Sequence, residues 1–395
     1  MTTLSERIGR DVLAGLTVAL VALPLAIAFG QSSGLGATSG VVTAIIAGFI
    51  AAAFGGSRFQ VSGPTGAMTV VLIPIFAEHG QSGVLAVGLI AGALVLLAGV
   101  FKLGRHVHRL PTSIIEGFTA GIALVIATQQ IPSALGADSN AAPWTSPTMA
   151  LATAVIVYVG ARRWQRAPIA IGAIAVMTIL DIGLNLETKT VPKLGELLAP
   201  PSADFLGAFA TWPSLLVPSL LVAALASLES LLSAKVADRM KSDGSSHDSD
   251  RELLGQGLAN IVVPFFGGVP ATAALARTAV NVKAGAETKW AACFHAVFLA
   301  AIVLGLSNFV ALIPLPALAG VLIATAAGMI KISELRATLR RSKLDAVVLA
   351  LTFALTVFTN LTAALAAGGV VWFTLRKTRL SDVLPPVENG ETLGD

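Results

Sequence analysis

Two charged residues lie where the sequence is otherwise apolar. Glu229 stands in the middle of the apolar run 226–232, and Arg277 closely follows a second apolar run. If such a run crosses a membrane, burying a carboxylate there costs a few kcal/mol, so the residue indicates a function. Glu229 could bind a proton, or it could coordinate Na⁺ together with the Ser233 hydroxyl one helical turn later. A structural ion pair between Glu229 and Arg277 or Lys235 is the alternative.

A motif rich in glycine and proline occurs once in each half of the chain. Each copy includes or follows a Phe-Gly-Gly; one reads Ser-Gly-Pro-Thr-Gly-Ala at 62–67, the other Gly-Gly-Val-Pro-Ala-Thr-Ala at 267–273. Pro64 and Pro270 are 206 residues apart, and the same shift moves the first apolar segment onto the segment that contains Glu229. Because proline favours the first turn of a helix, we expect extended backbone that leads into a helix near each proline. The sequence therefore predicts two structural repeats, which are inverted if each holds an odd number of spans.

Interrupted helices at matching positions of inverted repeats are typical of the central binding site of a transporter. Two helices that begin near the midplane direct free backbone N–H groups and positive dipole ends at each other, which favours an anion. Close packing or kinking at glycine and proline is the alternative, and threonines at these positions could simply cap helices. The residues that we expect at the anion site lie at the two helix starts, about two turns inside the second helix, and after the first apolar segment: Thr65, Gly66, Ala67, Ala271, Thr272, Ala273, Arg277, Phe29 and Gln31.

The composition of the 395-residue chain is that of a membrane protein. It is 55% hydrophobic and only 12% charged, whereas soluble domains carry roughly 25% charged residues. This excludes a soluble or disordered chain, and the single cysteine, Cys293, excludes a disulfide-stapled fold. A membrane-spanning helix needs about 20 apolar residues, and the stretches without Asp, Glu, Lys or Arg predict about fourteen segments. The predicted fold class is an all-α polytopic membrane protein.

Basic residues predict the orientation in the membrane. They cluster in short loops, such as Arg162 to Arg166, while the loop 132–146 has neither lysine nor arginine. The positive-inside rule then places both termini in the cytoplasm, with the residues from 376 onward as a polar tail. A net charge of +4 that is distributed in this way fits membrane orientation and gives no reason to expect a nucleic-acid partner.

These motifs resemble those of the sulfate permease (SulP) or solute carrier 26 group of anion transporters. The matching text is Leu23-Pro24-Leu25-Ala26-Ile27-Ala28-Phe29-Gly30, then 61–67, 247–260 and 264–281. The first of these segments looks most similar to the cyanobacterial bicarbonate transporters of the group. The resemblance implies a seven-plus-seven inverted repeat, shared with uracil permeases, in which half-helices 3 and 10 meet near the midplane.

The resemblance also implies a division of labour along the chain. A core domain (1–110 and 206–313) would carry the anion, and a gate domain (111–205 and 314–375) would form the homodimer surface during elevator-type transport, with 376–395 as a cytoplasmic tail. Members of the group usually end in a STAS domain, and the tail here is too short to fold into one, so we expect either a truncated chain or a naturally short member. The resemblance places a basic residue at Arg277 in the anion site, and the coupling ion, H⁺ or Na⁺, at Glu229 and Ser233.

We therefore expect a secondary active transporter of a small anion in the cytoplasmic membrane, with bicarbonate or sulfate favoured. An H⁺-coupled symporter of dicarboxylates such as fumarate, and an uncoupled anion channel or exchanger, remain open alternatives. The chain has no phosphate loop and no nucleophile–base pair at membrane depth, so we expect neither an enzyme nor a cofactor. His295 has no second histidine at ligand spacing, so no metal is expected apart from Na⁺ at Glu229 and Ser233.

Overall fold

The computed structural model describes residues 4–105, 112–137, 141–164, 169–193, 200–241 and 246–358. Within these residues the chain is helical except for one two-stranded sheet. The described residues form two compact units, a larger one within 1–109 and 122–329 and a smaller one within 110–121 and 330–395. The predicted tail 376–395, and the part of the predicted last spans that follows residue 358, lie outside the described residues.

The first repeat begins with three apolar helices in the larger unit. These are α1 (Leu4–Ser32), α2 (Ala37–Phe54) and α3 (Gly66–Val100). The backbone of Gly80 leaves the helical conformation, with φ 65°, so α3 consists of a shorter and a longer helix. This break divides the region into two helical segments that meet at Gly80.

The second repeat reproduces this order. A 3₁₀ segment, η2, leads into α8; α9 is followed by a short 3₁₀ turn, η3; and α10 and α11 complete the series. The bounds are η2 (Asp204–Thr211), α8 (Trp212–Lys241), α9 (Ser249–Val262), η3 (Val263–Phe266), α10 (Leu275–Lys283) and α11 (Trp290–Val310).

Two short strands join the repeats. β1 (Ser62–Gly63) pairs antiparallel with β2 (Thr272–Ala273), so Gly63 lies opposite Thr272. The extended backbone that the sequence predicts before each interrupted helix is therefore confirmed. The predicted helix start near Pro270 is wrong, because α10 begins only at Leu275, whereas α3 begins two residues after Pro64. The chain stays extended beyond Pro270 since Ala274 N–H donates to the Val61 carbonyl, which continues the strand pairing.

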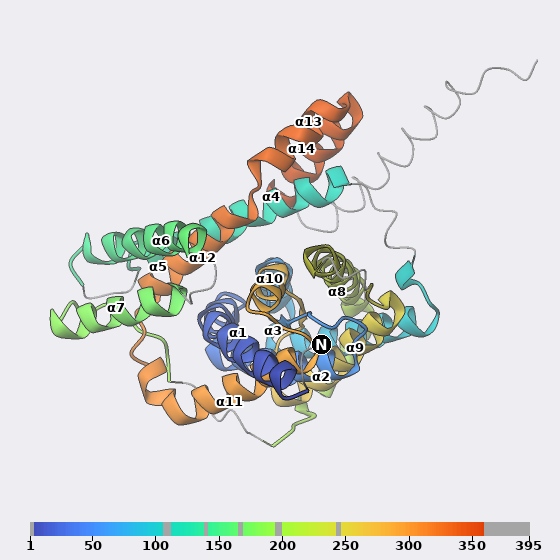
Figure 1. Cartoon of the computed structure of the whole chain (residues 1–395), viewed down its shortest axis with the longest axis horizontal. Coiled ribbons are helices and arrows are strands. Elements are labelled where there is room, and N and C mark those ends of the chain that lie inside the picture. The colour runs from blue at the N-terminus through green and yellow to red at the C-terminus, as the bar shows by residue number, and fades with distance from the viewer. Residues whose placement is uncertain are drawn as a thin grey trace, which may run out of the picture. The chain divides into compact units, whose positions relative to one another are not determined.

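Small residues allow these helices to approach closely. α3 packs against α8 and α9, and α1 packs against α2 and α11. Figure 1 shows α1, α2, α3, α8, α9 and α10 close to one another. One buried cluster consists of Ala47, Ala51, Ala259, Val263 and Ala271. In a membrane, such small side chains favour association by van der Waals contact between backbones.

The rest of the larger unit is a second group of helices. α6 packs against α7 and α12, and a β-bridge between Thr190 and Pro314 ties the segment after α7 to the turn before α12. α11 ends at Val310 and α12 begins at Leu315, so the chain turns at Pro314. The bounds are α5 (Ile131–Ala134), α6 (Thr145–Arg163), α7 (Ile169–Gly183) and α12 (Leu315–Met329).

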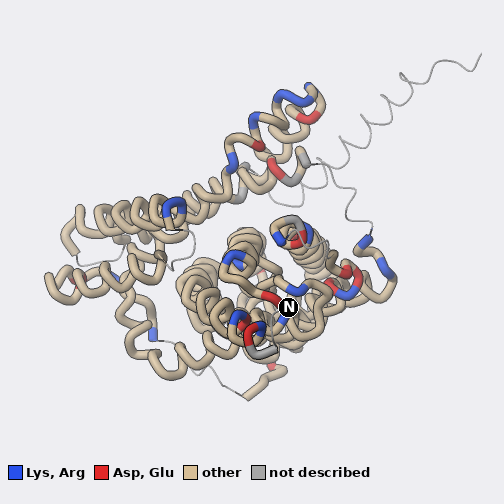
Figure 2. The backbone as a smooth tube through the Cα atoms, in the orientation of Figure 1, with Lys and Arg blue, Asp and Glu red and all other residues tan. Residues whose placement is uncertain are grey.

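The smaller unit contains the first part of α4 (Thr112–Gln129) together with α13 (Ile332–Arg341) and α14 (Lys343–Phe358). α4 approaches α14 so closely that a Cβ at Gly117 would collide with the Leu349 carbonyl oxygen. Within the described part of the chain, six helical segments are long and apolar enough to cross a bilayer. Charged residues gather mainly toward the ends of the helices, as Figure 2 shows.

Candidate functional site

One carboxylate connects the two interrupted helices. Glu229 projects from the middle of α8, and its Oε2 accepts hydrogen bonds from the Thr65 and Thr272 hydroxyls, each at 3.0 Å. Thr65 is the residue just before α3, and Thr272 lies in β2. Both threonines are buried, whereas the Glu229 side chain is partly exposed. The structure thus brings together three of the predicted site residues from three separate segments.

The start of α3 offers free backbone donors. Thr65 caps the helix by accepting from Met68 N–H at 3.3 Å, while among the described residues the Gly66 and Ala67 N–H groups have no partner. A Cβ at Gly66 would collide with Ile126 and would lie against the ring of Phe29. Phe29 therefore packs at this helix start, and a Cβ at position 66 would require the end of the Ile126 side chain to shift.

The start of α10 supplies donors from other residues than the sequence predicts. Ala271 N–H donates to Asn260 Oδ1 at 2.7 Å and Ala273 N–H donates to Ser230 Oγ at 3.2 Å, so neither group is available to a ligand. In the described structure the unpartnered N–H groups at this end belong to Leu275, Ala276 and Arg277. Sequence reasoning missed Leu275 and Ala276, because no capping side chain or proline marks the true start of α10.

Arg277 carries a buried charge without a carboxylate partner. Its side chain is 1% exposed, and Nη2 donates to the Pro64 carbonyl, while Nε and Nη1 have no hydrogen-bond partner. Arg277 and Glu229 do not form an ion pair within 4.0 Å among the described side chains. A Cβ at Gly63 would collide with Nη1, so the arginine needs glycine in the opposite strand. Two unpaired donors on a buried cation are an arrangement that an anion would complete.

Ser233 faces a different partner from the one that its spacing predicts. Its hydroxyl donates to Thr278 Oγ1 at 3.2 Å, and Thr278 Oγ1 in turn accepts from Val61 N–H at 3.1 Å. In the described structure Ser233 has no hydrogen bond to Glu229. The serine thus links α8 to α10 and to the residue before β1, and its role beside a coupling ion stays a prediction.

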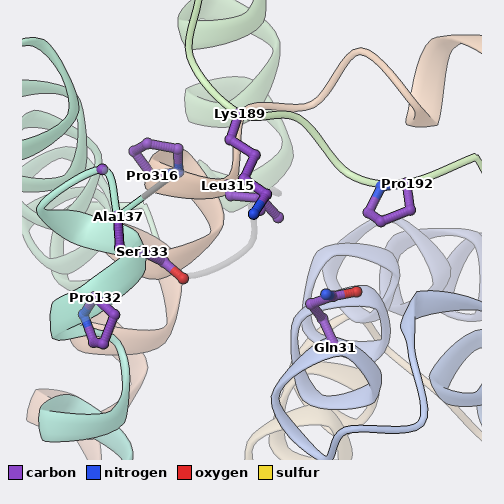
Figure 3. Close-up of a pocket in the computed structure, with 9 residues that line it drawn as sticks. Gln31, Pro132, Ser133, Ala137, Lys189, Pro192, Leu315 and Pro316 are labelled. Atoms are coloured by element: carbon purple, nitrogen blue, oxygen red, sulfur yellow. The ribbon is translucent and has the colours of Figure 1, made fainter. Parts of the chain in front are cut away.

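Gln31 lines a separate cavity. Its side chain is exposed and borders a cavity of about 200 Å³ together with Ser133 and Lys189 (Figure 3). The other lining residues are Pro132, Gly136, Ala137, Pro192, Leu315 and Pro316. Among the described contacts, Gln31 makes no hydrogen bond to Glu229 or Arg277. Thr65 and Thr272, by contrast, both donate to Glu229.

A family comparison identifies the group to which these features belong. The model of the sulfate permease family matches residues 8–352. The chain belongs to the sulfate permease family. Among its relatives in this family, the putative sulfate transporter YvdB of Bacillus subtilis is 36% identical over 409 residues, which are 98% of this chain and 77% of YvdB. The bicarbonate transporter BicA of Synechocystis is 31% identical, over 94% of this chain and 70% of BicA.

Solved structures of relatives have the same fold. The transmembrane domain of a cyanobacterial BicA superimposes with a TM-score of 0.82 at 30% identity, over 91% of this chain and 97% of that domain. The murine anion transporter Slc26a9 superimposes with a TM-score of 0.85, over 96% of this chain and 70% of that one. At 16% identity, the second match shows the fold alone.

Membership of the sulfate permease family establishes the class of protein. The chain is a multi-pass membrane protein with the seven-plus-seven inverted repeat of this family, and half-helices 3 and 10 correspond to the first part of α3 and to α10. It is an anion transporter. The resemblance found in the sequence motifs is confirmed.

Proposed function

We propose that this chain is a secondary active transporter that carries bicarbonate or sulfate and couples the anion to H⁺ or Na⁺ at Glu229. The observation that carries the proposal is the pair of hydrogen bonds from Thr65 and Thr272 to Glu229, because they attach one titratable carboxylate to both strand–helix junctions. The anion site then lies between the starts of α3 and α10.

Electrostatics supports an anion at this place. The free N–H groups of Gly66 and Ala67 and those of Leu275 and Ala276 mark the positive ends of two helix dipoles. Arg277 adds a full positive charge with two unpartnered donors. A small oxyanion supplies several acceptor oxygens at once and therefore matches this set of donors.

The same geometry supports coupling. Two negative charges repel each other strongly where water is scarce, so an anion next to ionised Glu229 binds weakly. The repulsion disappears when Glu229 takes up a proton, and it falls when Na⁺ binds beside Glu229. Because linkage is reciprocal, the anion must strengthen binding of the cation by the same factor. Binding of the proton or sodium ion and binding of the anion then favour each other, which is what cotransport requires.

The transport cycle that we propose is of the elevator type. The core domain, 1–110 and 206–313, moves the site across the membrane against a gate domain, 111–205 and 314–375, which also forms a homodimer. The strand pair β1–β2 supports movement of the core as one body, since it links the helix starts of both repeats. In this proposal the protein spans the cytoplasmic membrane, and both of its termini lie on the cytoplasmic side.

The choice of anion rests on the relatives. YvdB is named a putative sulfate transporter and BicA a bicarbonate transporter, at 36% and 31% identity respectively. Both anions are small oxyanions that suit the donors at the two helix starts. We therefore propose both as substrates to be compared, with fumarate as the test for a dicarboxylate carrier.

Uptake into proteoliposomes tests the proposal. Purified protein is assayed with radiolabelled bicarbonate, sulfate or fumarate under inward H⁺ or Na⁺ gradients, as wild type and as Glu229→Gln. We expect saturable uptake of bicarbonate or sulfate that one gradient drives above equilibrium, and loss of that accumulation in Glu229→Gln. Ser219→Ala is the matched control on α8, because among the described residues the buried Ser219 hydroxyl bonds only the Leu215 carbonyl of its own helix. Unchanged accumulation in Glu229→Gln would contradict the coupling role, and uptake that never exceeds equilibrium would indicate a channel.

A further inference from the structure

A second set of buried polar residues lies on one face of α9. Glu252, Gln256 and Asn260 follow one another at intervals of four residues, so they form a row along the helix. Each of the three is at most 1% exposed. A buried carboxylate or amide is costly unless it is hydrogen-bonded, so the partners of this row show what it holds in place.

Glu252 holds the segment that follows α2. Its Oε2 accepts from the Gly56 and Ser57 N–H groups, both at 3.0 Å, and its Oε1 accepts from Gln256 Nε2 at 2.9 Å. An ionised carboxylate with three donors is well satisfied in a buried place. The first member of the row therefore fixes the chain between α2 and β1 and also the next member of the row.

Gln256 holds β1. Its Nε2 donates to Ser62 Oγ at 2.7 Å as well as to Glu252. Since Glu252 Oε1 accepts this bond, the nitrogen of the amide, and not the oxygen, faces this side. Ser62 precedes Thr65 by three residues. The second member of the row thus sets the position of the strand that ends at the cap of α3.

Asn260 holds the residue before β2. Its Oδ1 accepts from Ala271 N–H at 2.7 Å, and its Nδ2 donates to the Ala271 carbonyl and to the Gln256 carbonyl, each at 2.9 Å. The side-chain amide therefore pairs with Ala271 as a neighbouring strand would. Ala271 is directly followed by Thr272, which donates to Glu229.

We propose that Glu252, Gln256 and Asn260 are positioning residues that set the separation of the two strand–helix junctions and thereby the affinity for the transported anion. None of them bonds Glu229 or Arg277 among the described contacts, so they act through β1 and through Ala271. This inference rests on the proposed anion site between α3 and α10. It predicts that loss of one member weakens substrate binding in protein that is still folded.

Asp11 provides a matched control. Asn260 and Asp11 have the same shape, are 1% and 2% exposed, and each makes three hydrogen bonds among the described residues. Those of Asp11 go to Glu287 N–H at 2.7 Å, Thr288 N–H at 3.1 Å and the Thr288 hydroxyl, in the loop between α10 and α11. Asp11→Ala and Asn260→Ala thus remove the same number of hydrogen bonds, but only the bonds of Asn260 hold a strand–helix junction.

The KM for uptake of radiolabelled sulfate and bicarbonate separates positioning from stability. For Asn260→Ala we expect KM to rise about fivefold or more with Vmax per folded molecule within about twofold, and for Asp11→Ala an unchanged KM. Asn260→Asp keeps the acceptor for Ala271 N–H and should give an intermediate KM. An unchanged KM in folded Asn260→Ala, or an equal rise in Asp11→Ala, would overturn the proposal.

Amide hydrogen exchange tests the same inference without transport. In detergent-solubilised full-length protein, Asn260→Asp should exchange faster than wild type by about tenfold in peptides covering 269–274, and Asp11→Ala only in peptides covering 285–290. This comparison applies if Asn260→Ala does not fold. If wild type takes up neither anion, the proposed function fails while exchange still decides the role of α9. Unchanged exchange at 269–274 in Asn260→Asp would overturn the inference.

Discussion

The two repeats meet in one site but supply it with different chemistry. The first repeat contributes a hydroxyl from Thr65 and backbone N–H groups at the start of α3, and α2 contains no charged residue. The second contributes both charges, Glu229 and Arg277, and the polar row on α9. Similar backbones therefore do not imply similar roles. Both repeats provide a threonine hydroxyl and backbone donors, whereas both charges come from the second repeat and the space for Arg277 comes from the first.

This difference has a steric basis at the strand pair. Arg277 enters from α10 and bonds the Pro64 carbonyl of the first repeat, and there is room for its guanidinium only because Gly63 has no side chain. The second repeat has no glycine at the matching position, because the residue of β2 that lies opposite Gly63 is Thr272. A large cation in one repeat thus requires a glycine in the other.

The largest effect should follow from removing the charge of the second repeat. We expect Arg277→Ala to lower Vmax/KM for anion uptake by about 100-fold or more, because a buried charge pair or charged hydrogen bond is worth roughly 3 kcal/mol. Arg277→Lys keeps the charge without the planar fork and should recover part of the activity. Initial uptake rates in proteoliposomes provide the measurement, and an Arg277→Ala protein with normal KM would contradict the assignment.

A smaller loss should follow from filling the space in the first repeat. Gly63→Val places a side chain where the Arg277 guanidinium lies, so we expect Vmax/KM to fall by about tenfold or more. Gly36→Ala serves as the comparison, since a Cβ at Gly36 meets no atom within 4 Å although its φ of 92° is strained for alanine. Equal uptake by Gly63→Val and wild type would show that the glycine is not required.

The two threonines allow a sharper comparison of the repeats. Each donates one hydrogen bond to Glu229, but Thr65 also caps α3. We expect Thr65→Val and Thr272→Val to raise KM by similar factors, while Thr65→Val lowers the free energy of unfolding by about 1 kcal/mol more, which is the usual worth of a cap. Thermal unfolding of the two purified variants measures this difference, and equal stability would argue against the cap.

The smallest effect is expected on α2, which lacks a polar row like that of α9. Thr43 Oγ1 donates to the Val269 carbonyl at 3.0 Å and to the Ser39 carbonyl of its own helix at 2.7 Å. Thr43→Val keeps the shape, so we expect KM to change by less than about twofold. A change as large as that of Asn260→Ala would mean that both repeats position the junctions equally.

The sequence predicts the architecture well because its signals are local and strong. Charge-free stretches mark the spans, Pro64 with Thr65 marks the start of α3, and the matched motifs predict the two extended segments. The start of α10 is missed because it depends on tertiary hydrogen bonds, among them that of Ala271 with Asn260. No pattern of residues in the motif itself records them.

The candidate site is only partly predictable for the same reason. The depth of Glu229 in an apolar run is visible in the sequence, and so is the hydroxyl that follows each proline. The i, i+4 spacing of Ser233 is equally visible, yet its hydroxyl bonds Thr278 across the helix interface. Spacing defines which residues share a helix face, whereas packing of α8 against α10 decides what that face meets.

The most direct test of a single anion site built by both repeats is to locate the bound anion. The anion that proves to be transported, or selenate in place of sulfate, is added to purified protein for structure determination. We predict density within hydrogen-bond distance of the N–H groups of Gly66 and Ala67, of Ala276 N–H and of the Arg277 guanidinium. Density only in the cavity beside Gln31 and Lys189 would contradict the account, as would an empty site in which Arg277 pairs with Glu229.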